Sequence, residues 1–286
     1  MAGRARSTGA ETAESHRVQF SVVQYYLVAY NVLSCLAWAW ILGRCLYHEI
    51  SGYWEPLSVG LKAQMMSLLR AMNPTAPSLF TPAVFNYLLP KWLHPLTNQA
   101  STMYAEVGLE VKIIQTFALL EVVHAMLGLV KSSLATTIMQ VASRLILVWG
   151  IADHYDQAKE NPLYASMVFA WSITEVIRYS WYALNLCDLK ISWLTWIRYT
   201  FFYVLYPVGA GSEAFVMFST LPPIVATAQS PRPILEMWME QPSAFVRLFL
   251  FLGWWPSLYV LYNHMRKQRR KVLGSFKAKG RSLKTE

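Results

Sequence analysis

The feature that most constrains this chain is a series of long apolar stretches. The run from about Val22 to Leu46 is the clearest of them, and it exceeds the roughly 20 residues that a helix needs to cross about 30 Å of hydrocarbon. Composition agrees, because 55% of the residues are hydrophobic and only 14% are charged, whereas about a quarter of a soluble domain is charged. We therefore predict an all-α, polytopic membrane helix bundle.

The apolar stretches predict six transmembrane helices, separated by prolines, glycines and charged residues. They cover about Val22–Leu46, Val111–Val130, Leu134–Ile151, Leu163–Leu186, Trp193–Phe218 and Ala244–Tyr262. The chain then divides into a polar N-terminus at 1–19 that we expect to be disordered, one membrane domain at 20–265, and a basic tail at 266–286.

The connection after the first span, residues 47–110, is long and rich in proline. It contains an amphipathic stretch, Leu57 to Met72, with apolar residues at helical spacing. Such a stretch is typical of a helix that lies on the membrane surface, and it could also cap the bundle.

Basic residues indicate the orientation. Nine of the 25 Lys and Arg residues lie within 266–286, directly after the last apolar stretch. A basic run in this place is typical of the cytosolic side of a span and of contact with anionic membrane lipid, and it does not require nucleic acid. Six spans then place both termini in the cytosol.

The sequence carries no pattern for a bound cofactor or metal. The three cysteines, Cys35, Cys45 and Cys187, lack metal-ligand spacing. There is no glycine-rich dinucleotide fingerprint and no nucleophile elbow. We therefore expect chemistry that uses side chains alone.

Several predicted spans carry ionisable or amide side chains, which are costly in lipid unless they pair or face a wet cavity. Those within one span are three or four residues apart and so share a helix face. They are Glu121 and His124 in the second span, Gln140 and Arg144 in the third, Glu175 and Arg178 in the fourth, and Arg198 in the fifth. Together they predict an internal polar chamber.

Structural interpretations of the same residues stay open. Glu175 and Arg178 could be a pair that only holds helices together. His124 is more typical of a buried histidine with satisfied hydrogen bonds. Arg198 could simply extend its charge towards the lipid headgroups.

Tyr206 and Glu213 in the fifth span form the strongest candidate site. Seven residues make two helical turns, so both share one face about 10 Å apart along the axis. We predict that Pro207, Gly209 and Gly211 interrupt the helix there, and irregular backbone at membrane depth is tolerated where it lines a cavity. A phenol and a carboxylate facing one cavity can act as an acid–base pair.

These elements resemble the very-long-chain (3R)-3-hydroxyacyl-CoA dehydratases, also called the protein-tyrosine-phosphatase-like family. The resemblance covers about residues 20–265. It rests on Leu120-Glu121-Val122-Val123-His124-Ala125, Gln140-Val141-Ala142-Ser143-Arg144, the run from Trp171 to Tyr179, Arg198-Tyr199, and Tyr206-Pro207-Val208-Gly209-Ala210-Gly211-Ser212-Glu213.

The resemblance implies a six-span enzyme of the endoplasmic reticulum that converts long-chain 3-hydroxyacyl-CoA to trans-2-enoyl-CoA, the third step of fatty-acid elongation. No cofactor is implied, since coenzyme A belongs to the substrate. The implied partners are the elongase condensing enzyme and the two reductases of the cycle. The implied catalytic residues are Tyr206 and Glu213, and the implied supporting residues are Glu121, Gln140, Arg144, Arg178, Arg198 and Gly209.

Some expectations remain alternatives at this stage. Arg198 and Arg178 could receive the coenzyme A phosphates. We favour Glu213 as the base and Tyr206 as the group that positions or protonates the hydroxyl, although the reverse is open. A non-catalytic scaffold of the elongation machinery, or a transporter using the same chamber, are other possible functions. The C-terminus has Lys284 but no full dilysine retrieval signal.

Overall fold

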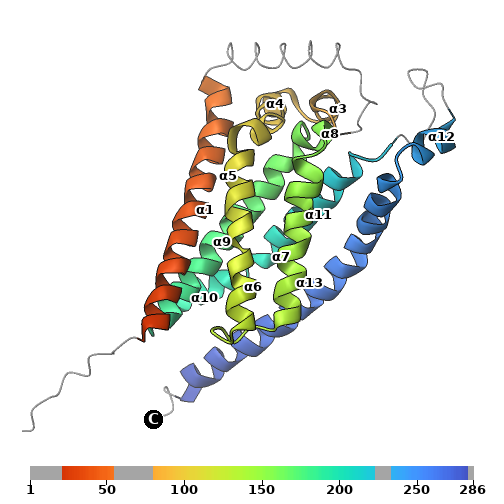
Figure 1. Ribbon diagram of the computed structural model, residues 1–286. Coiled ribbons are helices and arrows are strands. Elements are labelled where there is room, and N and C mark those ends of the chain that lie inside the picture. Colours follow the sequence, from red (N-terminus) through yellow and green to blue (C-terminus); the bar gives the residue numbers. More distant parts are fainter. Residues whose placement is uncertain (1–20, 55–79, 223–232, 283–286) are drawn as a thin grey trace, which may run out of the picture.

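The computed structural model describes residues 21–54, 80–222 and 233–282, and its regular structure over them is helical, without strands. Long helices lie side by side in one bundle, with several short helices at one end (Figure 1). The helices are α1 (Val22–Trp54), α3 (Pro82–Leu88), η1 (Lys91–Leu93), α4 (His94–Ala100), α5 (Met103–Phe117), α6 (Leu119–Met126), α7 (Leu134–Leu145), the π-helical η2 (Ile146–Ala152), α8 (Asp156–Lys159), α9 (Leu163–Leu186), α10 (Ser192–Arg198), α11 (Phe202–Phe218), α12 (Ile234–Met239) and α13 (Ser243–Ser282).

Within the described residues, four helical segments are long and apolar enough to cross a membrane, and they fit the predicted bundle. They are Val22–Gly52, Leu134–Ala152, Ser192–Phe218 and Ser243–Gly274. The other two predicted spans fall on α5 with α6 and on α9, which packs against both α1 and α11. The predicted all-helical class is confirmed, whereas the count of six crossings stays a prediction.

The apolar core lies between α1, α5, η2 and α9. Its largest fully buried side chains come from each of these helices and include Trp38, Ile41, Met103, Leu147 and Met167. Dispersion contacts between such side chains stabilise helix association where lipid removes the hydrophobic drive.

Helix α1 continues to Trp54, beyond the predicted end of the first span at Leu46. Neighbouring helices supply partners for its polar residues. Arg44 donates a hydrogen bond to Glu106 over 2.5 Å and also pairs with Glu110, both on α5. Beyond Leu46, the Nε2 of His48 also lies 2.9 Å from the hydroxyl oxygen of Thr102, next to the start of α5. The helix therefore continues past the apolar pattern because neighbouring helices supply partners for its polar residues.

The predicted first connection, 47–110, is partly helical. Its described second half contains α3, η1, α4 and the beginning of α5. The predicted amphipathic stretch Leu57–Met72 and the predicted disordered N-terminus 1–19 lie outside the described residues.

A polar contact joins α5 to the residue that follows η2. The Asp153 carboxylate accepts hydrogen bonds from the Tyr104 hydroxyl over 2.6 Å and from the Lys112 ammonium over 2.9 Å. These two donors lower the pKa of Asp153, since both favour its ionised form. The contact fixes this end of the α7–η2 segment against α5.

The predicted interruption of the fifth span at Pro207 is wrong. Helix α11 runs without a break through Pro207, and the turn lies earlier, at residues 199–201 between α10 and α11. Proline removes only one backbone donor, and helices in membranes tolerate it where neighbours and local adjustments compensate. The turn itself contains neither proline nor glycine, so the sequence has no conventional signal for it.

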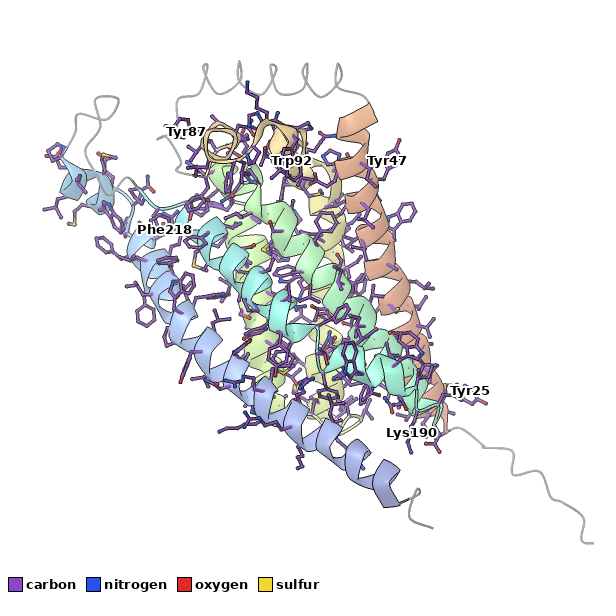
Figure 2. The ribbon with its side chains drawn as sticks, turned by 180° about the vertical axis from the view of Figure 1, so that it is seen from behind. Tyr25, Tyr47, Tyr87, Trp92, Lys190 and Phe218 are labelled. Carbon is purple, nitrogen blue, oxygen red and sulfur yellow. The ribbon has the colours of Figure 1, made fainter. Side chains whose placement is uncertain are left out.

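Helix α13 extends beyond the predicted sixth span, which was expected to end at Tyr262. It continues through the basic tail to Ser282. Figure 1 places this end of α13 at the same end of the bundle as the start of α1. Viewed from behind, Tyr25 and Lys190 lie at that end, whereas Tyr47 and Trp92 lie at the opposite one (Figure 2).

Gly209 allows α11 to approach α9 closely. A Cβ atom added at Gly209 would lie 3.3 Å from the Cβ of Ala170 on α9, whereas one added at Gly211 would meet nothing within 4 Å. Small residues at such a contact are typical of helix packing in membranes.

We predict that Gly209→Val lowers the unfolding temperature of the detergent-solubilised protein, because overpacking at Ala170 costs about 1–3 kcal/mol. Gly211→Val is the matched control, since it adds the same side chain to the same helix in open space. The double variant Gly209→Val/Ala170→Gly should recover part of the loss. Equal unfolding temperatures for Gly209→Val and Gly211→Val would contradict the close contact.

Candidate active site

The polar face of α11 carries the predicted pair. Because the helix is continuous, Tyr206 and Glu213 share one face about two turns apart. Both side chains are half-buried, and they interact electrostatically. Among the described residues no hydrogen bond joins the Tyr206 hydroxyl directly to Glu213, so a reacting group could lie between them.

Two tryptophans orient the Glu213 carboxylate. The indole N–H of Trp171, on α9, donates to Glu213 Oε1 over 2.6 Å, and that of Trp254, on α13, donates to Oε2 over 3.2 Å. An indole N–H is only a donor and an ionised carboxylate is only an acceptor, so the three groups are complementary. Glu213 is thereby anchored from two neighbouring helices.

Arg144, on α7, connects this carboxylate to the other charges of the bundle. It interacts electrostatically with both Tyr206 and Glu213. Its guanidinium carbon lies 5.0 Å from the centre of the Trp171 ring, and it pairs with Glu175. The site therefore combines a phenol, a carboxylate and a cation.

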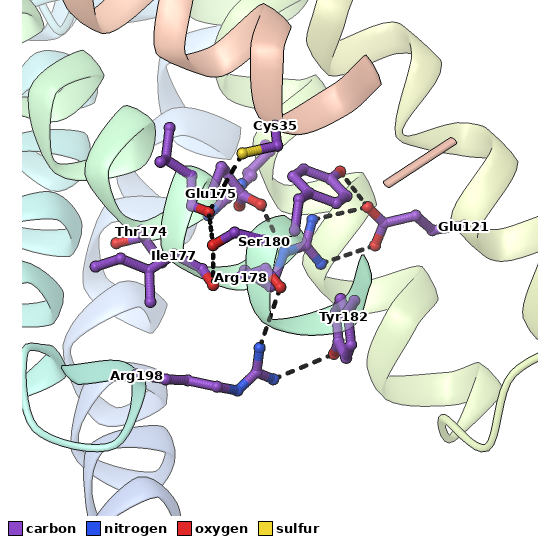
Figure 3. Close-up of polar contacts among 12 residues, drawn as sticks. Cys35, Glu121, Thr174, Glu175, Ile177, Arg178, Ser180, Tyr182 and Arg198 are labelled. Carbon is purple, nitrogen blue, oxygen red and sulfur yellow. Dashed lines mark hydrogen bonds and ion pairs between the residues drawn. The ribbon is translucent and has the colours of Figure 1, made fainter. Parts of the chain in front are cut away.

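The remaining predicted charges form a chain of ion pairs across α7, α9 and α6. Glu175 has no exposed surface and lies between Arg144 and Arg178. Arg178 donates to Glu175 from Nε over 2.5 Å and to both oxygens of Glu121 over 2.7 and 2.8 Å (Figure 3). The hydroxyl of Tyr179 also donates to Glu121. Glu175 and Arg178 do form an ion pair, and this pair is part of a longer series of ion pairs that also includes Arg144 and Glu121.

The sequence suggested that Arg178 could receive substrate phosphates. The structure argues against this role, because carboxylates occupy its Nε and both terminal nitrogens. Arg198 lies beside it at the start of the turn before α11 (Figure 3). It donates to the backbone oxygen of Arg178 over 3.5 Å and to the Tyr182 hydroxyl over 3.3 Å, and its guanidinium carbon lies 4.2 Å from the Trp181 ring centre.

The remaining candidate residues, His124, Gln140 and Gly209, lie outside the chain of ion pairs. His124 is buried and its Nε2 lies 2.8 Å from the Tyr26 hydroxyl, as expected for a satisfied core histidine. The Gln140 side chain is exposed, and the Ser143 hydroxyl donates to the backbone oxygen of Gln140. Gly209 contributes the close contact with Ala170. The structure thus brings together all the predicted polar residues except Gln140. Each of the others belongs to the chain of ion pairs or forms a hydrogen bond or an electrostatic interaction with a member of it.

Sequence reasoning missed the role of the two tryptophans. Trp171 was noted only as part of a motif, and Trp254 was not noted at all. Tryptophans are common at both membrane interfaces, so their pattern cannot reveal which of them donates to a buried carboxylate. The cysteines are free, and within the described ranges no three His, Cys, Asp or Glu side chains are placed to hold a metal ion.

We predict that Glu175→Gln strongly destabilises the protein, because it leaves the largely buried Arg144 without a carboxylate and leaves Arg178 with Glu121 alone. Breaking a buried pair costs about 3–5 kcal/mol. Glu110→Gln is the matched control, since Glu110 pairs with Arg44 at a site where its side chain is 32% exposed, and exposed pairs contribute at most about 1 kcal/mol. Tryptophan fluorescence during heating measures the unfolding temperatures of both variants. Similar decreases in the two temperatures would contradict the central role of Glu175.

Comparison with known proteins identifies the family. The profile of the family described as "Protein tyrosine phosphatase-like protein, PTPLA" matches residues 115–275. A Schizosaccharomyces pombe protein, "Probable very-long-chain (3R)-3-hydroxyacyl-CoA dehydratase", is 40% identical over 178 residues, which are 62% of this chain and 80% of that protein. The Caenorhabditis elegans dehydratase hpo-8 is 34% identical over 260 residues, 88% of this chain and 96% of its own length.

A human relative, "Very-long-chain (3R)-3-hydroxyacyl-CoA dehydratase 2", is 33% identical over 60% of this chain and 68% of its own. No solved structure matches. The profile match covers the ion-pair chain, the two tryptophans and the Tyr206–Glu213 pair. The chain belongs to the PTPLA family.

Proposed function

We propose that this protein is a membrane hydro-lyase that dehydrates very-long-chain (3R)-3-hydroxyacyl-CoA to trans-2-enoyl-CoA. The names of its relatives support the reaction. The observation that carries the proposed site is the Tyr206–Glu213 pair on one face of α11, with Glu213 anchored by two indoles.

In the proposed reaction Glu213 is the base. It removes the proton from C2 of the substrate, next to the thioester carbonyl. The C3–O bond then breaks, and Tyr206 protonates the departing hydroxyl, which leaves as water. Return of the proton from Glu213 to Tyr206 restores the enzyme. The two indole donors suit this assignment, since they bond to Glu213 as a carboxylate.

Arg144 supplies positive charge where negative charge develops. It interacts with both reacting side chains, and a preorganised cation stabilises such charge most where water is excluded. Its ion pair with Glu175 holds it in place. We propose that Arg144 positions and stabilises, and that it does not itself transfer a proton.

We propose further that the chain crosses the membrane of the endoplasmic reticulum six times, with both termini cytosolic. The common end of α1 and α13 in Figure 1 supports an even number of crossings, and the basic residues of 266–286 support the cytosolic side. The elongase condensing enzyme and the two reductases are the proposed partners, because they would supply the substrate and consume the product.

We predict that Tyr206→Phe and Glu213→Gln each lower kcat about 10²–10⁴-fold, as expected for loss of a general acid or base. The measurement is the rate of enoyl-CoA formation by the purified protein from a long-chain 3-hydroxyacyl-CoA.

Tyr259→Phe and Glu236→Gln are the matched controls, because both residues are exposed and lie outside the site. They should retain the wild-type rate and unfolding temperature, and both site variants should remain folded at the assay temperature. Full activity of both site variants would refute this assignment.

We also predict that turnover needs no added cofactor. The purified protein should form the enoyl product at an unchanged rate after dialysis against EDTA and without nicotinamide, since elimination of water transfers no electrons. Loss of activity on dialysis that a divalent metal restores would contradict the proposed chemistry.

A further inference from the structure

A cavity of about 610 Å³ lies between α10 and the C-terminal half of α13. Trp193 and Trp196 line it from α10, and Arg269 and Arg270 line it from α13. It is at the same end of the bundle as Lys190, which Figure 2 labels beside α10. None of its lining residues belongs to the ion-pair chain or to the reacting pair.

The two arginines of this cavity differ from Arg144 and Arg178 in their charge partners. Arg144 and Arg178 are paired with carboxylates, whereas within the described part of the chain Arg269 and Arg270 form no ion pair. The Nε of Arg269 is buried and has no hydrogen-bond partner there. A buried donor without a partner is costly, and a guanidinium fork matches the oxygens of phosphate. The cavity therefore carries two guanidinium charges that no carboxylate of the described residues neutralises, which suits a phosphate anion.

The tryptophans add an aromatic wall. Trp193 and Trp196 are three residues apart and so share a face of α10, with 64% and 49% of their surfaces exposed. Stacking of a nucleobase on such a ring contributes about 1–3 kcal/mol. Arginines beside indole faces suit a ligand that carries both a phosphate and a flat ring, which is the chemistry of a nucleotide.

Arg269, which lines the cavity, also contacts α11 through Tyr203. The guanidinium carbon of Arg269 lies 5.4 Å from the centre of the Tyr203 ring. Tyr203 precedes Tyr206 by three residues, about 4.5 Å along the helix axis. A ligand in the cavity is thus near the end of the face that carries Tyr206 and Glu213.

We propose that this cavity binds the phosphate-bearing nucleotide end of the substrate's coenzyme A, with Arg269 and Arg270 on the phosphates and the tryptophans beside the adenine. The proposal rests on the proposed function and deepens it. It replaces Arg178, whose donors are occupied, as the phosphate receiver.

Binding of free coenzyme A to the purified full-length protein, measured by isothermal titration calorimetry, tests the proposal. Arg269→Gln/Arg270→Gln should weaken binding at least tenfold, since each hydrogen bond to a charged group is worth about a factor of ten or more. Binding of pantetheine, which lacks the nucleotide, should not change between wild type and this variant.

Lys267→Gln/Lys271→Gln is the matched control. It removes the same charge from the same helix at exposed positions that do not line the cavity, and it should leave the affinity for coenzyme A within about twofold. Equal weakening by both double variants, or no weakening by the arginine variant, would overturn the proposal.

A second experiment tests whether the cavity binds a lipid headgroup in place of the nucleotide. Binding of a short-chain phosphatidic acid is measured on the same variants. A greater loss for phosphatidic acid than for coenzyme A would identify a lipid site and overturn the proposal.

A turnover arm separates this proposal from the proposed function. With a 3-hydroxyacyl-CoA the arginine variant should show a KM raised at least tenfold at unchanged kcat, and with the N-acetylcysteamine thioester of the same acyl chain both constants should match wild type. If the wild-type protein binds coenzyme A through the arginines but forms no enoyl product, the proposed function is refuted and the proposed binding site is not. If it dehydrates the substrate but binds coenzyme A independently of the arginines, the binding site is refuted and the function is not.

Discussion

The structure depends on one chain of buried ion pairs, Arg144–Glu175–Arg178–Glu121, which joins α7, α9 and α6. Each charge in it would be expensive at membrane depth if it were alone. Alternating signs and the bidentate bond from Arg178 to Glu121 satisfy nearly all donors and acceptors at once. Because Glu175 is fully buried between two guanidiniums, the three helices can adopt only a narrow range of relative positions.

Helix α9 transmits this constraint to the reacting side chains. Within nine residues of one another it places Ala170 against Gly209, Trp171 against Glu213, and Glu175 and Arg178 in the ion-pair chain. Glu175 and Arg178 are therefore on the same helix as Trp171, which orients the proposed catalytic carboxylate of Glu213. Glu213 receives its second anchor from α13, so its position also reports how α13 packs on α11.

The arginines divide into two groups with different roles. Arg144 and Arg178, inside the bundle, are neutralised by carboxylates and determine geometry. Those at the cavity between α10 and α13 have no such partner in the described part of the chain and are suited to an external anion. This difference supports a structural role for Arg144 and Arg178 and the proposed role of Arg269 and Arg270 in binding the substrate.

The sequence alone determined what depends on neighbours along the chain. Apolar stretches long enough to span a bilayer, and pairs such as Tyr206 and Glu213 on one face, follow from helix length and periodicity. Only the tertiary structure decided which partners meet: Glu175 with Arg144, Trp254 with Glu213, and Gln140 with no side chain of the cluster. It also moved the break of the fifth span from Pro207 to residues 199–201. Periodicity defines the faces of one helix, whereas contacts between helices depend on packing that no single segment encodes.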